Sequence, residues 1–125
     1  MTIQDALEIA DEMKPNMMSP RLKFKYLTEI EQLIHEEIIL KHVHPAEMDE
    51  KPEYTEESSP DTVLRIPDPY AMVYVYWLMS KIDIQNQEDG RYNIDRAHFE
   101  SAYDTMSDWY TREHMPKQTT REFRL

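Results

Sequence analysis

The chain has 125 residues, and its 25 acidic against 14 basic side chains give a formal net charge of −11. This charge argues against tight, direct binding of nucleic acid, because phosphate contacts need clustered lysine and arginine. The chain contains no cysteine, which excludes disulfides and thiol chemistry, and no apolar run approaches the ~20 residues that cross a bilayer. We therefore expect one soluble domain that acts in a cytoplasm or in a particle assembled there.

A short helix is predicted over residues 2–13, because Pro15 forbids its continuation. Thr2 and Asp5 have the spacing of a capping box, with Asp in place of the usual Glu. One side of this helix is apolar and consists of Ile3, Ala6, Leu7, Ala10 and Met13.

A second helix is predicted over residues 19–43, where Ser19 before Pro20 marks the start and Pro45 follows the end. At 1.5 Å rise per residue it would be roughly 35 Å long. Its apolar positions at helical spacing are Leu22, Tyr26, Leu27, Ile30, Leu33, Ile34 and Ile38. We expect the opposite side to face water with Glu29, Glu31, Glu36 and Glu37.

A long acidic loop is predicted over residues 44–67, since prolines at 45, 52 and 60 preclude a continuous helix. Loops of this length in small domains are usually functional or disordered. Residues 62–66 alternate in polarity and predict a short strand, whose partner would be the first half of the loop or another subunit. The acidic side chains are Glu47, Asp49, Glu50, Glu53, Glu56, Glu57 and Asp61, against only Lys51 and Arg65.

The densest apolar run, residues 66–84 (IPDPYAMVYVYWLMSKIDI), is the centre of the chain. By residue propensity it could be a strand, but Asp68 before Pro69 is a helix-start signal and the apolar spacing is helical. We predict a helix over residues 68–87 that is apolar on more than one side. Such a helix is either central to its bundle or shared with a neighbouring subunit.

A turn around Gly90, the only glycine, leads to a fourth predicted helix over residues 93–114, with Asn93 as its cap and Pro116 after its end. The chain is thus predicted to be all-α: a small bundle of about four helices within residues 1–115, followed by an extended C-terminal arm, residues 116–125. The core positions are expected to be Leu27, Ile30, Ile34, Tyr74, Trp77, Leu78, Phe99, Tyr103 and Met106.

Few residue patterns suggest chemistry. The run from His35 to Ile39 begins like a zinc-protease helix, but isoleucine stands where the second histidine would be. His42 and His44 lack a third ligand at fixed spacing, and Ser58 has no base at a defined spacing. The tyrosines and tryptophans of the last two helices are at core spacing, although a ligand pocket is conceivable. We expect no enzyme, metal or cofactor, and we interpret the acidic loop and basic arm as features of an assembly component.

The chain resembles head–tail connector (adaptor) proteins of siphophages and prophages of Gram-positive bacteria. The resemblance is carried by IPDPYAMVYVYWLMSKID, QNQEDGRYNIDRAHFESAY and WYTREHMPK, together with the opening DALEIADEMKPNMMSPRLKFKYLTEIEQLIHEEII. It implies a helical subunit of a ring, generally of twelve copies, in the neck of a virion assembled in the host bacterial cytoplasm. Its partners would be the portal protein and the next neck or tail-completion protein, with no cofactor and no membrane.

The resemblance also implies roles for the two unusual segments. The C-terminal arm would reach the portal. The resemblance matches no individual contact residues; from position and chemistry we expect the docking residues to be Lys117, Arg121, Phe123, Arg124 and Leu125. The acidic loop would lie at the channel and at neighbouring subunits, where like charge lets DNA pass without tight binding. The alternative from charge alone is an acidic DNA mimic that inhibits a basic host or phage protein, although the basic arm argues against it.

Overall fold

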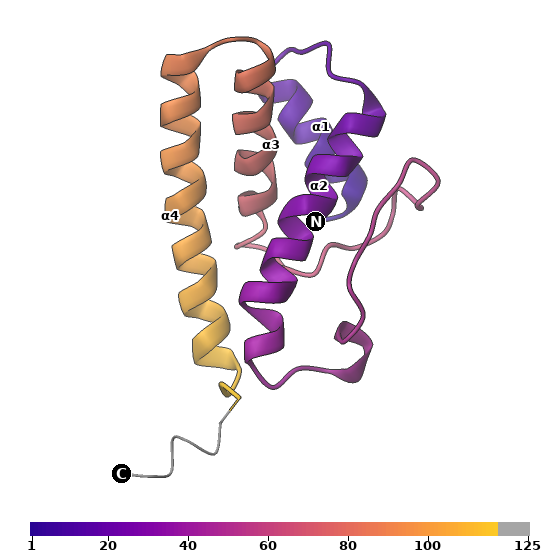
Figure 1. Ribbon diagram of the computed structural model, residues 1–125, viewed down its shortest axis with the longest axis vertical. Helices are drawn as coiled ribbons and strands as arrows, with labels where there is room; N and C mark the ends of the chain where they lie inside the picture. The colour runs from indigo at the N-terminus through magenta and orange to yellow at the C-terminus, as the bar shows by residue number, and fades with distance from the viewer. Residues whose placement is uncertain (118–125) are drawn as a thin grey trace.

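The computed structural model describes residues 1–117 and contains four α-helices: α1 (Ile3–Met13), α2 (Pro20–Glu37), α3 (Met72–Gln85) and α4 (Asp89–Glu113) (Figure 1). Two single-turn 3₁₀ helices, η1 (Ile39–Lys41) and η2 (Ala46–Met48), lie between α2 and α3. Across residues 1–117 the structure has two isolated β-bridges and no strand, which confirms the predicted all-α bundle. None of the helices in these residues is both long and apolar enough to cross a membrane.

The first two helices begin where the sequence predicts. The Thr2 side chain accepts a hydrogen bond from the Asp5 N–H, and the Asp5 carboxylate accepts one from the Thr2 N–H, both at 3.1 Å. The Ser19 hydroxyl accepts from the Leu22 N–H at 3.2 Å, and Pro20 occupies the first helical position. Local side-chain chemistry therefore fixes both starts.

The prediction that the second helix runs to residue 43 is wrong. Helix α2 ends at Glu37, because Ile38 leaves helical geometry with φ −121° and His42 is extended. The reason lies far away in the sequence. The Val43 N–H donates to the Met115 carbonyl at 2.7 Å, and the Lys117 N–H donates to the Lys41 carbonyl at 2.9 Å. We call residues 41–43 and 115–117 together the arm junction.

The start predicted for the third helix at residue 68 is also wrong. Helix α3 begins at Met72 without a side-chain cap, and residues 67–71 form a turn closed by the Tyr70 N–H on the Pro67 carbonyl at 2.9 Å. This turn places the Tyr70 ring against the Trp109 ring of α4, with centroids 4.7 Å apart. An aromatic contact between α4 and the chain before α3 thus accompanies the late start.

The start predicted for the fourth helix at residue 93 is four residues too late. Helix α4 begins at Asp89, so that Gly90 and Asn93 are inside it. The chain reverses at Gln87, which adopts a left-handed φ of 57°, and the Glu88 N–H donates to the Asp83 carbonyl at 2.9 Å. The turn therefore does not use the glycine.

Helix α3 is the centre of the bundle. It packs against α1, α2 and α4, and Figure 1 shows it between α4 and the two N-terminal helices. Its buried residues lie all around it: Val73, Tyr74, Val75, Trp77, Leu78, Met79, Ser80, Ile82 and Asp83. The excess of apolar side chains therefore has partners within its own chain, as expected of a central helix.

The expected core residues are buried with one exception. Tyr103 is half-buried at the edge of the core, whereas the other eight are at most 6% exposed. Met13, placed on the apolar side of the first helix, is 50% exposed instead. Helix α1 packs against α3 chiefly through Ile3, Ala6 and Ala10, which are buried.

Candidate functional site

The acidic loop is folded onto α2 and α3, and a buried glutamate anchors it. Glu31 was expected to face water, but it is 0% exposed. Its carboxylate accepts hydrogen bonds from the Tyr74 hydroxyl at 2.6 Å, the Tyr54 hydroxyl at 2.8 Å and the Arg65 N–H at 3.1 Å. A buried carboxylate is tolerated when several donors converge on it. Glu31 therefore joins α2, the loop and α3 in one hydrogen-bonded unit.

Arg65 ties the two ends of the loop together. Its guanidinium donates to the Glu50 carbonyl at 2.6 Å and to Nδ1 of His35 at 2.7 Å. Because the guanidinium has only donors, the Nδ1 atom of His35 is the acceptor and the ring is neutral. Burial, followed by the charge of Arg65, lowers the pKa of His35. The Arg65 side chain thus fixes the loop with hydrogen bonds that a neutral histidine completes.

Further bonds hold the middle of the loop along α2. The Thr28 hydroxyl accepts from the Tyr54 N–H at 2.9 Å and donates to the Tyr54 carbonyl at 3.0 Å, and the Gln32 side chain donates to the Pro52 carbonyl at 2.9 Å. The strand predicted over residues 62–66 is absent. Its place is taken by a single antiparallel bridge between Val63 and Thr2, so the partner is the N-terminal segment of the same chain.

The backbone of the loop is thus held while its acidic side chains point outward. All seven of them are exposed: Glu47, Asp49, Glu50, Glu53, Glu56, Glu57 and Asp61. The loop therefore presents negative charge to whatever lies beside it.

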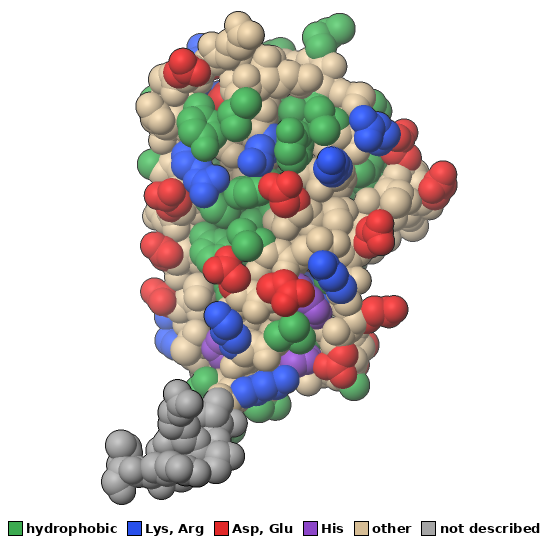
Figure 2. Space-filling view, in the orientation of Figure 1, with side chains coloured by type: hydrophobic (Ala, Val, Ile, Leu, Met, Phe, Trp, Pro, Cys, Tyr) green, Lys and Arg blue, Asp and Glu red, His purple; other side chains and the backbone are tan. Residues whose placement is uncertain are grey.

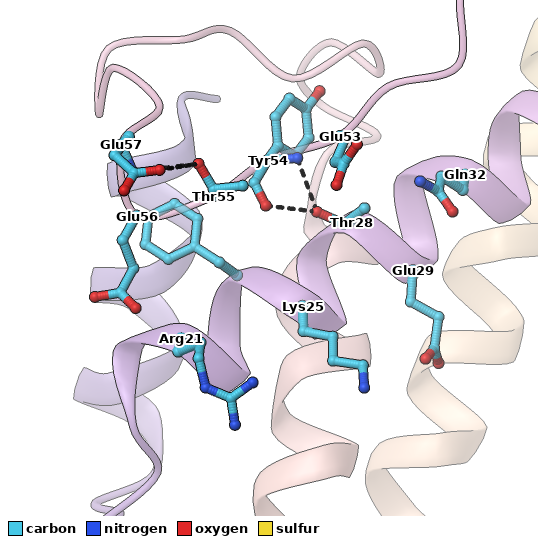
Figure 3. A pocket seen from close by; sticks show the side chains of 11 residues that line it. Arg21, Lys25, Thr28, Glu29, Gln32, Glu53, Tyr54, Thr55, Glu56 and Glu57 are labelled. Carbon is cyan, nitrogen blue, oxygen red and sulfur yellow. Dashed lines mark hydrogen bonds between the residues drawn. The ribbon is translucent and has the colours of Figure 1, made fainter.

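A groove of about 430 Å³ separates part of this acidic loop from α2 (Figure 3). Glu53, Glu56 and Glu57 line its loop side, and Arg21 and Lys25 line its helix side. Figure 3 shows the two cations on the α2 side and Glu56 and Glu57 on the loop side. The groove thus offers both signs of charge to a partner.

The start of the C-terminal arm is bonded to the body. Lys117 is exposed, but its backbone belongs to the arm junction, in which Pro116 forms an antiparallel bridge with His42. The other arm residues expected to dock, Arg121, Phe123, Arg124 and Leu125, lie outside the described residues. The acidic loop consequently begins beside the arm junction, and its later residues run back along α2.

The two histidines near the arm junction do not face a common site. Nδ1 of His42 lies 2.7 Å from the Ile38 carbonyl, whereas Nε2 of His44 lies 2.6 Å from the Asp49 carboxylate. The His42 ring packs edge-on against Tyr110 at 5.3 Å between centroids. Each imidazole ring contacts different neighbours. The contact of His42 with Tyr110 holds the arm junction on α4.

The aromatic residues of α3 and α4 mostly contact one another. Trp77 and Phe99 have ring centroids 5.0 Å apart, and the Trp77 indole N–H donates to the Tyr26 carbonyl at 3.0 Å. The Lys81 ammonium group lies over the indole ring, 4.3 Å from its centroid. These contacts are those of core packing, not of a ligand pocket.

The structure reveals a buried charge cluster that sequence reasoning missed. Lys14, at the end of α1, lies 2.8 Å from Asp83 of α3 and 3.0 Å from Asp95 of α4. Burial and then the neighbouring Asp95 carboxyl group raise the pKa of Asp83 to about 6. Burial alone would lower the pKa of Lys14, but the two carboxylates raise it. The available signal was Asp83 itself, the one acidic residue of α3.

Burial also raises the pKa of Glu31, and its hydrogen bonds oppose this rise, with that from Tyr74 the largest. The pKa values of Tyr54 and Tyr74 are raised as well, first by burial and then by the charge of Glu31. Both hydroxyls therefore keep their protons and act as donors to the carboxylate. This arrangement holds the loop on the bundle and so supports the fold.

Comparisons of the chain with protein-family models, with curated proteins and with solved structures find no match.

Proposed function

We propose that the protein is a head–tail connector (adaptor) subunit, which forms a ring below the portal of a tailed phage and bridges capsid and tail. The proposal starts from the resemblance carried by residues 66–83, 85–103 and 109–117. A connector subunit needs a stable body and segments that are free to meet neighbouring proteins. It needs no reaction site.

The observation that carries the proposal is the arm junction. There the start of the C-terminal arm and the start of the acidic loop lie at the same end of the bundle, joined by the bonds from Val43 to Met115 and from Lys117 to Lys41. The arm has three basic side chains against one acid, and it also has two apolar side chains, Phe123 and Leu125. A subunit built in this way can present a portal-binding arm beside a channel-facing loop.

The charge of the loop supports its proposed position on the wall of the DNA channel. Its seven carboxylates are exposed, whereas its backbone is held by Glu31 and Arg65. Repeated around a ring of twelve, these side chains would form a negatively charged wall that does not bind DNA phosphates tightly. A held loop can line a channel without closing it.

The same exposed acids favour one other function, an acidic DNA mimic that inhibits a basic protein. That function predicts binding that weakens with salt and that DNA outcompetes. It gives the arm no role, and the cations Arg21 and Lys25 interrupt the acidic surface beside the loop.

Mixing the protein with the portal protein of the same phage, followed by electron microscopy, tests the proposal. We expect rings of this protein on the portal. The double variant Phe123→Ser and Arg124→Glu should abolish binding, whereas Glu56→Gln with Glu57→Gln, which changes only the loop, should leave portal binding intact. Absence of any complex with the unmodified chain, or its retention by the arm variant, would contradict the proposed function.

A further inference from the structure

A second groove lies between α2 and α4, on the face shown in Figure 2. Its volume is about 220 Å³, and it is lined by Leu33, Glu37, Arg96, Phe99, Glu100, Tyr103 and Asp104. Figure 2 shows hydrophobic side chains along the seam between the two helices, with charged side chains beside them. The two helices are separated here because both pack mainly on α3.

The floor of this groove is aromatic and rigidly held. The Phe99 ring packs on Trp77 at 5.0 Å and on Tyr103 at 5.6 Å between centroids. The Tyr103 hydroxyl donates to the Glu37 carboxylate at 3.2 Å, which connects α4 to α2 across the groove. Phe99 is only 4% exposed, and the Arg96 guanidinium lies over its ring. An apolar side chain in the groove would therefore contact chiefly Leu33 and the half-buried Tyr103 ring.

The rim of the groove is acidic. Glu37, Glu100 and Asp104 contribute three carboxylates against the single cation Arg96. The Arg96 guanidinium is already engaged, since it lies 5.2 Å from the centroid of the Phe99 ring and 3.4 Å from Glu100. A segment that fits this groove therefore carries an apolar anchor between positive charges.

We propose that the occupant is the C-terminal segment of the same chain, residues 118–125. In the sequence QTTREFRL the anchor Phe123 stands between Arg121 and Arg124, and Leu125 follows. Two arginines against one acid match the surplus of carboxylates on the rim. The aromatic anchor matches the half-buried Tyr103 ring that lines the groove.

The segment starts after Lys117, which lies close enough to the groove for the following residues to reach it. The Lys117 N–H is bonded to the Lys41 carbonyl at 2.9 Å, and the antiparallel pairing points the chain from residue 43 back toward the end of α2. Lys41 is four residues after Glu37, so the two lie within about 14 Å of each other. Leu33 is a further ~6 Å along α2. Phe123, six residues after Lys117, reaches up to ~22 Å and therefore reaches the groove.

This docking does not depend on the connector function, because it rests on the groove, its charges and the position of Lys117. If the protein is a connector, the groove stores the arm until the portal displaces it. A tether of this length gives an effective concentration on the order of 1 mM. If the groove binds the segment with a dissociation constant of about 100 µM, the ratio of bound to free segment is then about ten to one.

Tryptic cleavage of the full-length chain after Arg121 tests the docking, because a protease cuts only the undocked segment. The reference is the free peptide of residues 117–125 under the same conditions, and mass spectrometry follows both cleavages. We expect cleavage in the protein to be about tenfold slower than in the peptide, and equally slow at all protein concentrations. Cleavage at the rate of the peptide would overturn the proposal, and so would protection that grows with protein concentration, which would indicate docking on a second copy.

A matched pair of variants locates the docking site. Glu100→Gln with Asp104→Asn removes two rim charges one helical turn apart, and we expect cleavage to become at least threefold faster. Glu8→Gln with Glu12→Gln removes two exposed charges at the same spacing on α1, away from the groove, and cleavage should not change. Equal effects of the two double variants would show that net charge, and not the groove, controls the segment, and would also overturn the proposal.

Discussion

Removing the hydroxyl of Tyr74 should be one of the most damaging single-atom changes in this protein. The hydroxyl is fully buried, donates to Glu31 at 2.6 Å and accepts the Ile66 N–H at 2.9 Å. In Tyr74→Phe the carboxylate loses a hydrogen bond of about 1.5–3 kcal/mol, and the Ile66 N–H is left unpaired at a cost of about 1–3 kcal/mol. We therefore expect the free energy of unfolding to fall by about 3 kcal/mol or more.

Two other tyrosines provide a graded series for the same measurement. Tyr54→Phe removes a donor to Glu31 but leaves no backbone group unpaired. We therefore expect the free energy of unfolding to fall by about 1.5 kcal/mol. Tyr103→Phe removes a 3.2 Å bond to the exposed Glu37 and should cost about 0.5 kcal/mol or less. The order of the three losses follows from burial and from the number of bonds that each hydroxyl makes.

Urea unfolding followed by tryptophan fluorescence measures this series. With a denaturant slope of about 1–3 kcal/mol/M, a loss of 3 kcal/mol moves the midpoint by roughly 1–3 M. An unchanged slope would show that the native state is otherwise intact. If Tyr74→Phe shifted the midpoint no more than Tyr103→Phe, Glu31 would not be the anchor that holds the loop on the bundle.

Three further outcomes are expected. Trp77→Ala should lower the free energy of unfolding by about 3–5 kcal/mol, because Trp77 is only 6% exposed; a near-zero change in a urea melt would contradict its place in the core. The folded chain holds the proton of Asp83 up to a pKa of about 6 instead of 3.8, so stability should decline as the pH rises between these values. Asp83→Asn should remove part of that decline in pH-dependent melts, and an unchanged pH profile would refute the raised pKa of Asp83 in the folded chain. Deleting residues 116–125 should leave the helical circular dichroism intact and abolish portal binding, whereas unfolding would mean that the body needs the arm junction.

Local signals predicted the helix starts near the N-terminus well. Thr2 with Asp5 and Ser19 with Pro20 act through groups within three residues, so the sequence is sufficient to identify them. The central position of α3 was one of two predicted alternatives. Only the packing of the other helices could decide between them, because an apolar surface looks the same whether its own chain or a neighbour covers it.

Helix ends that depend on distant contacts were mispredicted. The apolar pattern of α2 continues through Ile38 and Ile39, but the pairing of residues 41–43 with 115–117 ends the helix at Glu37. The residues next to Ile38 in the sequence do not predict that pairing. In the same way, the reversal before α4 uses the left-handed Gln87, although Gly90 was the expected turn residue.

The largest error concerned the acidic loop, which was described by its charge and length. Its anchor, Glu31, was grouped with the solvated acids of α2, yet it lies four residues after Leu27 and three before Ile34, on the buried side. Helical spacing alone could therefore have identified it as an acid in need of donors. The donors themselves, from Tyr54, Arg65 and Tyr74, come from 23 to 43 residues away and could not be inferred.

The proposal that this chain is a subunit of a virion neck is tested most directly by cryo-electron microscopy of purified particles of a tailed phage whose genome carries its gene. We predict a closed ring of copies between portal and tail, with each density accommodating helices α1 to α4 and with the C-terminal arm reaching the portal. A neck whose density is fully accounted for by other proteins, in particles from which this chain is absent by mass spectrometry, would contradict the claim.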